Sequence, residues 1–303
     1  MRIGVSLASS HGVRDGRDGA RRMIERTRVA RDAGLWCLTV GDHHVNARPY
    51  YQNVPILGWL LAEWGDERPA GCLFLLPLWS PVLLAEQVGT LATCAGEPFI
   101  VQTGIGWGPT ERQAMGVGER PRGEVADAMI PLVKALLAGE TCDDDYFGVR
   151  GAHVSPVPPG AVEWWIGATA PAGIDRAARL GDCWYAGPEC SVAEAGARAQ
   201  RYHERCAAHG TTPRRLPIRQ DVYVAATDEE AEAVVQPLLA RGYRGLRRDQ
   251  VAVGSPATVA ERFAAYAAAG FTDIIVRQMN VTQDQALSSY ELLGEVRRLV
   301  ADL

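Results

Sequence analysis

The chain has 303 residues, of which 47% are hydrophobic and 22% charged, and its 31 basic and 36 acidic side chains give a formal net charge of −5. This apolar fraction is typical of folded globular proteins and excludes general disorder. A negative net charge provides no basic field for a phosphate backbone, and no apolar run reaches the roughly 18–20 residues of a membrane span. We therefore expect neither a nucleic-acid nor a membrane partner. The N-terminal segment turns polar at Ser9 and Ser10, before a signal-peptide core could form, which predicts a cytoplasmic protein.

Seven cysteines are scattered along the chain without a C-x-x-C pair: Cys37, Cys72, Cys94, Cys142, Cys183, Cys190 and Cys206. A disulfide framework or a structural zinc site would need closer, paired spacing. Several of them lie in apolar runs, so we expect reduced cysteines that act as small buried hydrophobic side chains.

Apolar runs of strand length alternate with helical patterns from one end of the chain to the other. The first third predicts strands at residues 2–8, 35–40, 70–76 and 98–104, with helices at 20–33, 51–64 and 81–94 between them. The remainder predicts strands at 162–166, 182–187, 217–226 and 272–277, with helices at 123–138, 171–180, 191–209, 227–240, 255–269 and 283–303. Thr227, with Glu230 three residues later, has the spacing of a capping box.

Residues 139–160 break the alternation with three consecutive aspartates, several glycines and three prolines. Because strands and helices resume at once, we interpret this stretch as an excursion between the helix after strand four and strand five. Eight apolar strands, each followed by a helix, indicate an α/β protein built as a single (β/α)8 TIM barrel, one domain over residues 1–303. A doubly wound open sheet is the alternative.

The segment Asp42-His43-His44 follows strand two, at the end of the barrel where active sites are built. A histidine there can act as a general base, hydrogen-bond an anionic intermediate or bind a metal. The same residues could instead cap or pack a loop. A metal site is a weaker alternative, because no H-x-H follows strand one and no histidine stands at the ends of strands five to eight.

Two further segments offer binding features. Residues 165–173 lead strand five into a helix with small residues, the Thr169 hydroxyl and free N–H groups that suit a phosphate, although a tight turn would need the same small residues. Gly104 and Gly106 after strand four would let a flat ligand approach, and Trp107, Trp79 and Tyr50 suggest an apolar or aromatic substrate pocket.

Seven segments in order resemble the bacterial luciferase-like superfamily of flavin-dependent monooxygenases and F420-dependent oxidoreductases. They begin at Ala33, Asp42, Leu76, Gly104, Ile166, Ala177 and Val253. The resemblance implies a TIM barrel with the flavin ring across its C-terminal mouth, and His43, with His44 beside it, as the catalytic histidine that stabilises an oxygenated flavin or protonates a product. It also implies the cofactor-binding residues Cys72, Leu73, Thr103, Gly104, Gly106, Gly167, Ala168, Thr169, Ala170 and Gly173. The family often has a non-prolyl cis peptide at the position of Cys72 and Leu73.

The resemblance leaves the cofactor open between reduced FMN and coenzyme F420. Reduced FMN with O2 would make a monooxygenase acting on a small organic substrate, and a flavin reductase would supply the reduced FMN. This is our first interpretation. F420 would make a hydride-transfer enzyme, and its acidic tail would favour Arg14, Arg17, Arg48 or Arg277 near the mouth. Residues 93–98 lack the arginine usual in the family, which also suggests a non-catalytic flavin-binding homologue. A metal-dependent hydrolase using Asp42, His43 and His44 is the last alternative. Relatives are often dimers through helices two and three, so we expect a homodimer.

Overall fold

A computed structural model describes residues 1–106 and 108–301. Its main sheet has nine parallel strands: β1 (Arg2–Leu7), β2 (Leu38–Val40), β3 (Pro69–Leu75), β4 (Gly96–Gly104), β7 (Val162–Gly167), β8 (Cys183–Tyr185), β9 (Pro217–Val224), β10 (Val251–Gly254) and β11 (Asp273–Gln278). Their order is β10-β9-β11-β1-β2-β3-β4-β7-β8. The sheet closes because Ala186, just after β8, pairs in parallel with Ile218 of β9. The predicted parallel barrel is therefore confirmed, with β10 as an additional strand that pairs with β9.

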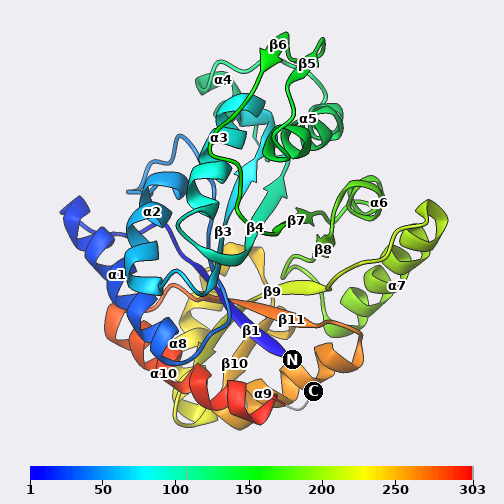
Figure 1. Ribbon diagram of the computed structural model, residues 1–303. Helices are drawn as coiled ribbons and strands as arrows, with labels where there is room; N and C mark the ends of the chain where they lie inside the picture. Colours follow the sequence, from blue (N-terminus) through cyan, green and yellow to red (C-terminus); the bar gives the residue numbers. More distant parts are fainter. Residues whose placement is uncertain (107, 302–303) are drawn as a thin grey trace.

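Helices follow the strands and surround the sheet (Figure 1). They are α1 (Gly16–Asp32), α2 (Asn53–Trp64), α3 (Pro81–Ala92), α4 (Pro109–Ala114), α5 (Arg122–Leu137), α6 (Pro171–Leu180), α7 (Val192–His209), α8 (Asp228–Ala240), α9 (Pro256–Ala268) and α10 (Gln283–Leu299). Local capping explains several starts: Asp15 caps α1, and Ser191 with Glu194 forms a full capping box on α7. Thr227 caps α8 by accepting the backbone N–H of Glu230, as its spacing predicts. In Figure 1, α10 runs back beside α1, so the two ends of the chain meet.

Four elements were missing from the sequence prediction: β10, α4, β5 and β6. Strand β10 is only four residues long and lies between α8 and α9, where it pairs with the upper part of β9 through Val251 opposite Asp221. A strand this short depends on its tertiary partner and gives little signal of its own. Helix α4 is only six residues long. The excursion forms an antiparallel hairpin of β5 (Cys142–Asp144) and β6 (Val149–Ala152) beside α5 (Figure 1).

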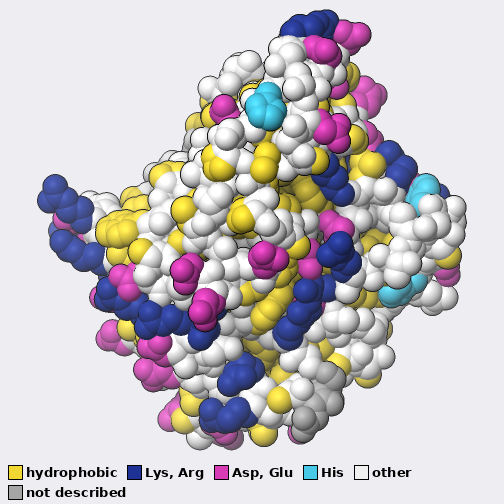
Figure 2. All heavy atoms as spheres, in the orientation of Figure 1, with side chains coloured by type: hydrophobic (Ala, Val, Ile, Leu, Met, Phe, Trp, Pro, Cys, Tyr) yellow, Lys and Arg dark blue, Asp and Glu magenta, His cyan; other side chains and the backbone are white. Residues whose placement is uncertain are grey.

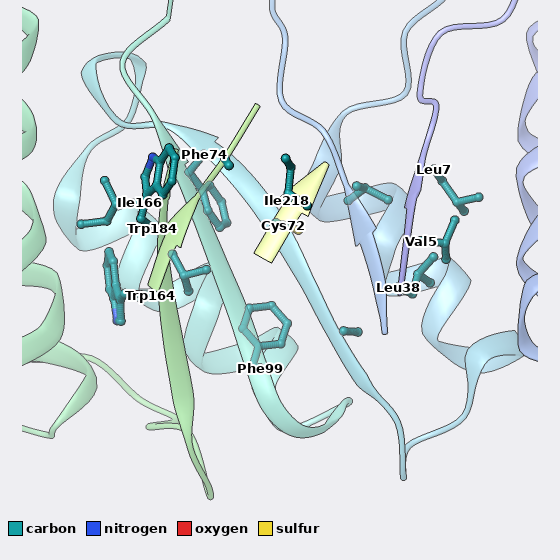
Figure 3. Close-up of a cluster of buried hydrophobic side chains, with 14 of the residues drawn as sticks. Val5, Leu7, Leu38, Cys72, Phe74, Phe99, Trp164, Ile166, Trp184 and Ile218 are labelled. Atoms are coloured by element: carbon teal, nitrogen blue, oxygen red, sulfur yellow. The ribbon is translucent and has the colours of Figure 1, made fainter. Parts of the chain in front are cut away.

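The main hydrophobic core lies between the sheet and the helices. Figure 3 shows part of it, with outward-facing strand residues packed together: Val5, Leu7, Leu38, Cys72, Phe74, Phe99, Trp164, Ile166, Trp184 and Ile218. This one cluster takes residues from Ile3 near the start to Val300 near the end. It supports the expectation of one domain over residues 1–303, which stays a prediction.

A second, smaller cluster fills the lower interior of the barrel with Cys37, Ile100, Trp165, Cys183 and Ile275. Because strand side chains alternate between faces, the next inward residues towards the carboxyl ends are two positions further on. They are polar: Gln102 follows Ile100, Tyr185 follows Cys183, and Arg277 follows Ile275. The interior therefore changes from apolar below to polar above, where a cavity opens.

All seven cysteines are free, and six are buried, as the sequence predicts; Cys94 is the exception, since it is exposed at the end of α3. In the described part of the chain, no helix combines the length and the apolar character that crossing a membrane requires.

Candidate active site

The cavity at the carboxyl ends of the strands has a volume of about 880 Å³, within the usual range of ligand sites. Loops after β1, β2, β4 and β11 form its rim. Of the predicted site residues, His43, His44, Tyr50 and Leu73 line it. The structure therefore brings the histidine pair, one predicted pocket aromatic residue and one predicted ring-binding residue together.

Asp42 organises this site from beneath. Its side chain is fully buried, and Oδ2 accepts hydrogen bonds from the Leu75 backbone N–H and from Trp79 Nε1, both at 2.8 Å. These two donors fix the orientation of the carboxylate. Its other oxygen, Oδ1, lies 3.0 Å from His44 Nε2. This carboxylate raises the pKa of His44 despite the histidine's partial burial, so His44 retains its proton to higher pH than a free histidine.

His43 is held by a different carboxylate. Its Nδ1 lies 3.0 Å from Glu111 Oε1, and the same oxygen accepts the backbone N–H of His44 at 2.6 Å. The His43 side chain is 51% exposed, against 14% for His44. Val45, the next residue, has a φ of 53°, which is unusual for a β-branched side chain. Strain of this kind directly after the histidine pair is typical of a functional site.

Polar groups on the cavity wall lack regular partners. Gln102 Nε2 and Tyr185 OH are both buried and neither makes a hydrogen bond of normal geometry, although the two side chains are neighbours. Ser9 Oγ is in the same situation. Burial raises the pKa of Tyr50 to about 12, and burial also raises the pKa of Tyr185, so both phenols stay protonated at neutral pH. Unsatisfied donors of this kind suit the carbonyl and nitrogen edges of a bound ring.

Most of the predicted cofactor residues lie outside the cavity lining: Cys72, Thr103, Gly104, Gly106, Gly167, Ala168, Thr169, Ala170 and Gly173. Cys72 faces the outer core instead. The cis peptides of the described chain precede Pro98 and Pro156, so the bond between Cys72 and Leu73 is trans. Trp79 lies behind the cavity, where it holds Asp42 and packs edge-on against His44. Trp107 lies outside the described residues.

The segment before α6 has structural reasons for its small residues. A Cβ on Gly173 would come within 2.6 Å of the Ala168 methyl, and one on Gly167 within 2.8 Å of the Thr103 carbonyl oxygen. Helix α6 also begins without a side-chain cap at Ala170, which leaves first-turn N–H groups for an anion. However, the Thr169 hydroxyl donates to Glu189, so an acidic side chain stands beside this helix start.

Sequence reasoning missed part of the site. Arg219 and Arg244 line the cavity with Arg277, Gln102 and Tyr185, and of these five residues the sequence indicates only Arg277. The available signal was an arginine and an aspartate two positions apart within a predicted strand, Arg219 and Asp221, because that spacing puts both side chains on the same face of the strand. Arg48 also lines the cavity, whereas Arg14 and Arg17 do not. The family departure at residues 93–98 lies at the amino end of β4, away from Gln102 and the cavity.

The metal alternative has no ligand cluster. Within residues 1–106 and 108–301, no group of three or more His, Cys, Asp or Glu side chains has an arrangement that could hold a metal ion. His43 and His44 lie against different carboxylates, and the oxygens of Asp42 face His44 and two N–H groups.

A parallel barrel whose strand ends surround a deep cavity with two histidine–carboxylate pairs has the construction of a TIM-barrel enzyme. The particular family follows from comparison with family models: residues 1–250 match the model described as luciferase-like monooxygenase. The chain therefore belongs to the luciferase-like monooxygenase family, and the resemblance predicted from its sequence is confirmed.

Similar solved structures include enzymes of both cofactor types. The oxygenating constituent of 3,6-diketocamphane monooxygenase from Pseudomonas putida, a type II Baeyer-Villiger monooxygenase in complex with FMN, has a TM-score of 0.82 at 16% identity and covers 100% of this chain and 99% of its own. An F420-dependent secondary alcohol dehydrogenase with an F420-acetone adduct has a TM-score of 0.78 at 15% identity, covering 98% and 99%. At these identities the likeness shows the fold.

Among curated relatives, the F420-dependent glucose-6-phosphate dehydrogenase of Mycolicibacterium fortuitum is 27% identical over 173 residues, which are 54% of this chain and 52% of the relative. The aligned segments cover between 39% and about half of the length of these curated relatives.

Proposed function

We propose that this protein is an oxidoreductase with a flavin-type cofactor across the barrel mouth, and that it is a monooxygenase using reduced FMN and O2 on a small organic substrate. The observation that carries the proposal is the Asp42–His44 pair, a histidine held 3.0 Å from a fully buried carboxylate at the edge of a cavity of about 880 Å³. This arrangement provides a proton donor and acceptor beside a space large enough for a ring and a substrate.

The residues present fit such a cofactor. Leu73 and Leu75 offer an apolar wall for the flat ring, and the unsatisfied donors Gln102 Nε2 and Ser9 Oγ suit its carbonyl groups. The uncapped start of α6 at Ala170 would hold the phosphate. Reduced FMN, when bound, would supply the electrons that activate O2.

The chain's own side chains then move protons. His44 Nε2 faces Asp42, which leaves Nδ1 as the ring nitrogen that has no partner among the described residues and can exchange a proton with substrate. Asp42 fixes the ring and stabilises its charged form, as the carboxylate partner of a catalytic histidine does. His43 and Glu111 form a second, more exposed pair at the rim, which can relay a proton to solvent.

F420-dependent hydride transfer is the second candidate, and two observations favour it. Arg48 and Arg277 line the cavity, as an acidic cofactor tail would require, and a curated relative named as F420-dependent aligns over half of this chain. With F420 as hydride acceptor, His44 would take the hydroxyl proton of an alcohol substrate.

The test begins with fluorescence titration of the purified protein with FMN and, separately, with F420. The reoxidation rate of bound reduced FMN in air-saturated buffer then gives a readout that needs no organic substrate, and anaerobic F420 reduction by secondary alcohols and sugar phosphates tests the second candidate. His44→Gln should slow the relevant step about 100-fold or more while cofactor affinity is kept. The exposed His153 provides the matched control, His153→Gln, with wild-type rates.

Three outcomes separate the alternatives. Preference for F420 with no FMN binding would replace the monooxygenase by the hydride-transfer enzyme. Cofactor binding without any turnover would favour a non-catalytic flavin-binding homologue. An unchanged rate in His44→Gln would remove the Asp42–His44 pair from the mechanism.

We also propose a homodimer formed through α2 and α3. Trp59 on α2 and Leu83 on α3 are 52% and 46% exposed, and hydrophobic side chains reach the surface in the region of α1 and α2 (Figure 2). Large exposed apolar side chains on neighbouring helices are typical of an interface. Trp59→Glu should convert a dimer to a monomer in light scattering; a monomeric wild-type protein would contradict this proposal.

A flavin reductase partner would be needed to supply reduced FMN under the monooxygenase proposal. A cytoplasmic location is consistent with seven free cysteines, since thiols persist in a reducing compartment.

A further inference from the structure

Three arginines gather on one side of the cavity. Arg219 comes from β9, Arg277 from β11, and Arg244 from the 3₁₀ turn η2 (Tyr243–Gly245), which lies between α8 and β10. In the closed sheet, β9 and β11 lie three or four strand positions from β3 and β4. The arginines therefore face Leu73 and Gln102 across the cavity.

Among the residues that the structure describes, one carboxylate accompanies them. Asp221 is fully buried and accepts a hydrogen bond from Tyr243 OH at 2.8 Å, while Arg219 Nε and Arg244 Nε approach its two oxygens no closer than 3.4 Å. Regular charge-assisted hydrogen bonds are shorter, about 2.7–2.9 Å. Arg277 has no hydrogen bond or ion pair with any described residue. Three cations against one anion leave this cluster, which we call the arginine cluster, with an excess of two positive charges.

The other acidic groups of the cavity do not balance this excess. Asp42 is engaged by His44 and two N–H donors, and Glu111 by His43 and the His44 backbone. Both lie at the β2 side of the mouth.

Holding the arginine cluster together is unfavourable for the protein alone. Arg244 has a φ of 49° between Gly242 and Gly245, so its backbone occupies the left-handed region that few non-glycine residues adopt. Burial, followed by the charges of Arg277 and Arg219, lowers the pKa of Arg244 to about 10. Like charges and a strained backbone that converge on a cavity are typical of a binding site whose ligand relieves the repulsion.

We infer that Arg219, Arg244 and Arg277 bind the oxyanion of a substrate, a carboxylate, phosphate or sulfonate, and thereby orient an acidic small molecule towards His44. That this ligand is a substrate rests on the proposed function. The position supports a substrate over the cofactor, because Leu73 and Gln102, which suit the ring, lie on β3 and β4 across the cavity from the arginines. Guanidinium groups are the side chains best suited to bidentate recognition of such oxyanions.

The experiment uses inorganic phosphate as the probe and the full chain without cofactor. Phosphate binding is measured by thermal shift and calorimetry at constant ionic strength, for wild type, Arg277→Gln, Arg244→Gln and the control Arg201→Gln. Arg201 is exposed on α7 and makes no ion pair with a described residue. We expect the two cluster variants to bind phosphate about 10- to 100-fold more weakly and the control to match wild type. Without phosphate, Arg277→Gln should melt no lower than wild type, because it removes repulsion and no ion pair.

FMN and F420 titrations of the same variants identify the ligand. Unchanged cofactor affinity alongside weakened phosphate binding supports the substrate assignment. Cofactor affinity that falls in parallel with phosphate binding overturns it and assigns the arginine cluster to the cofactor. Phosphate binding that is absent in wild type, or equal in all four proteins, overturns the oxyanion site itself. If neither cofactor binds while phosphate binding depends on the arginine cluster, the proposed function fails and the oxyanion site stands.

Discussion

His11 gives the sharpest prediction about pH. His11 follows β1 in the sequence, and its side chain lines the cavity. The residue is only 5% exposed, and its Nε2 is buried with no hydrogen-bond partner among the described residues. Burial, followed by the charge of Arg26, lowers the pKa of His11 from 6.5 to about 4. The folded protein therefore holds His11 neutral where the unfolded chain would already be protonated.

The sign and size follow from proton linkage. Between pH 6.5 and 4 the unfolded state binds more protons at this site, so the free energy of unfolding falls as the pH falls. At 1.36 kcal/mol for each tenfold difference in proton affinity, His11 should remove about 2 kcal/mol of stability by pH 5 and about 3 kcal/mol by pH 4.

The measurement is urea unfolding of wild type and His11→Gln at several pH values from 7 down to 4. The variant should lose less stability over this range by the amounts above, whatever its stability at pH 7. His203→Gln, at an exposed histidine on α7, is the control and should follow the wild-type curve. If His11→Gln loses stability as steeply as wild type, His11 is not held neutral in the folded protein and the reasoning fails.

Further predictions concern the site and the barrel interior. Asp42→Asn removes the charge that raises the pKa of His44, so the part of the pH profile of FMN reoxidation that depends on His44 should move to lower pH. The variant also removes a carboxylate that accepts two N–H groups, so the free energy of unfolding measured in urea should fall by about 2 kcal/mol or more. A pH profile that does not move would show that Asp42 does not control His44. Val45→Gly should stabilise the protein by up to about 1 kcal/mol in the same assay, because glycine adopts a φ of 53° without strain; a clear loss would refute the strain. Ile275→Ala, at a fully buried position inside the barrel, should cost about 2–5 kcal/mol, whereas the exposed Val157→Ala should stay within about 0.5 kcal/mol; equal effects would contradict the interior packing.

The barrel was predictable because its signals are local and repeated. Parallel strands buried on both faces, such as β1 and β3, read as short apolar runs, and capping residues such as Thr227 mark where helices begin. The order of these elements was enough for the (β/α)8 fold, and Asp42-His43-His44 could be placed at the mouth because every strand end in a parallel barrel points to the same side.

The sequence alone could not rank the two histidines or identify their partners. Glu111 is 67 residues from His44, and only the folded chain brings its carboxylate to the His44 backbone and the His43 ring. Likewise, Trp79 was expected to line the pocket, whereas its indole N–H is used by Asp42, a contact that local sequence cannot reveal.

The arginine cluster shows most clearly which features can be predicted from the sequence and which depend on the folded chain. Arg219 and Arg277 stand on separate strands, and Arg244 stands in a turn that no periodicity predicts. Sequence by itself determined which residues face inward on each strand, because side chains alternate with a period of two. Which of these side chains meet, how deeply Asp221 is buried and how much charge is left uncompensated were decided by closure of the barrel, since those quantities depend on distances between segments far apart in the chain.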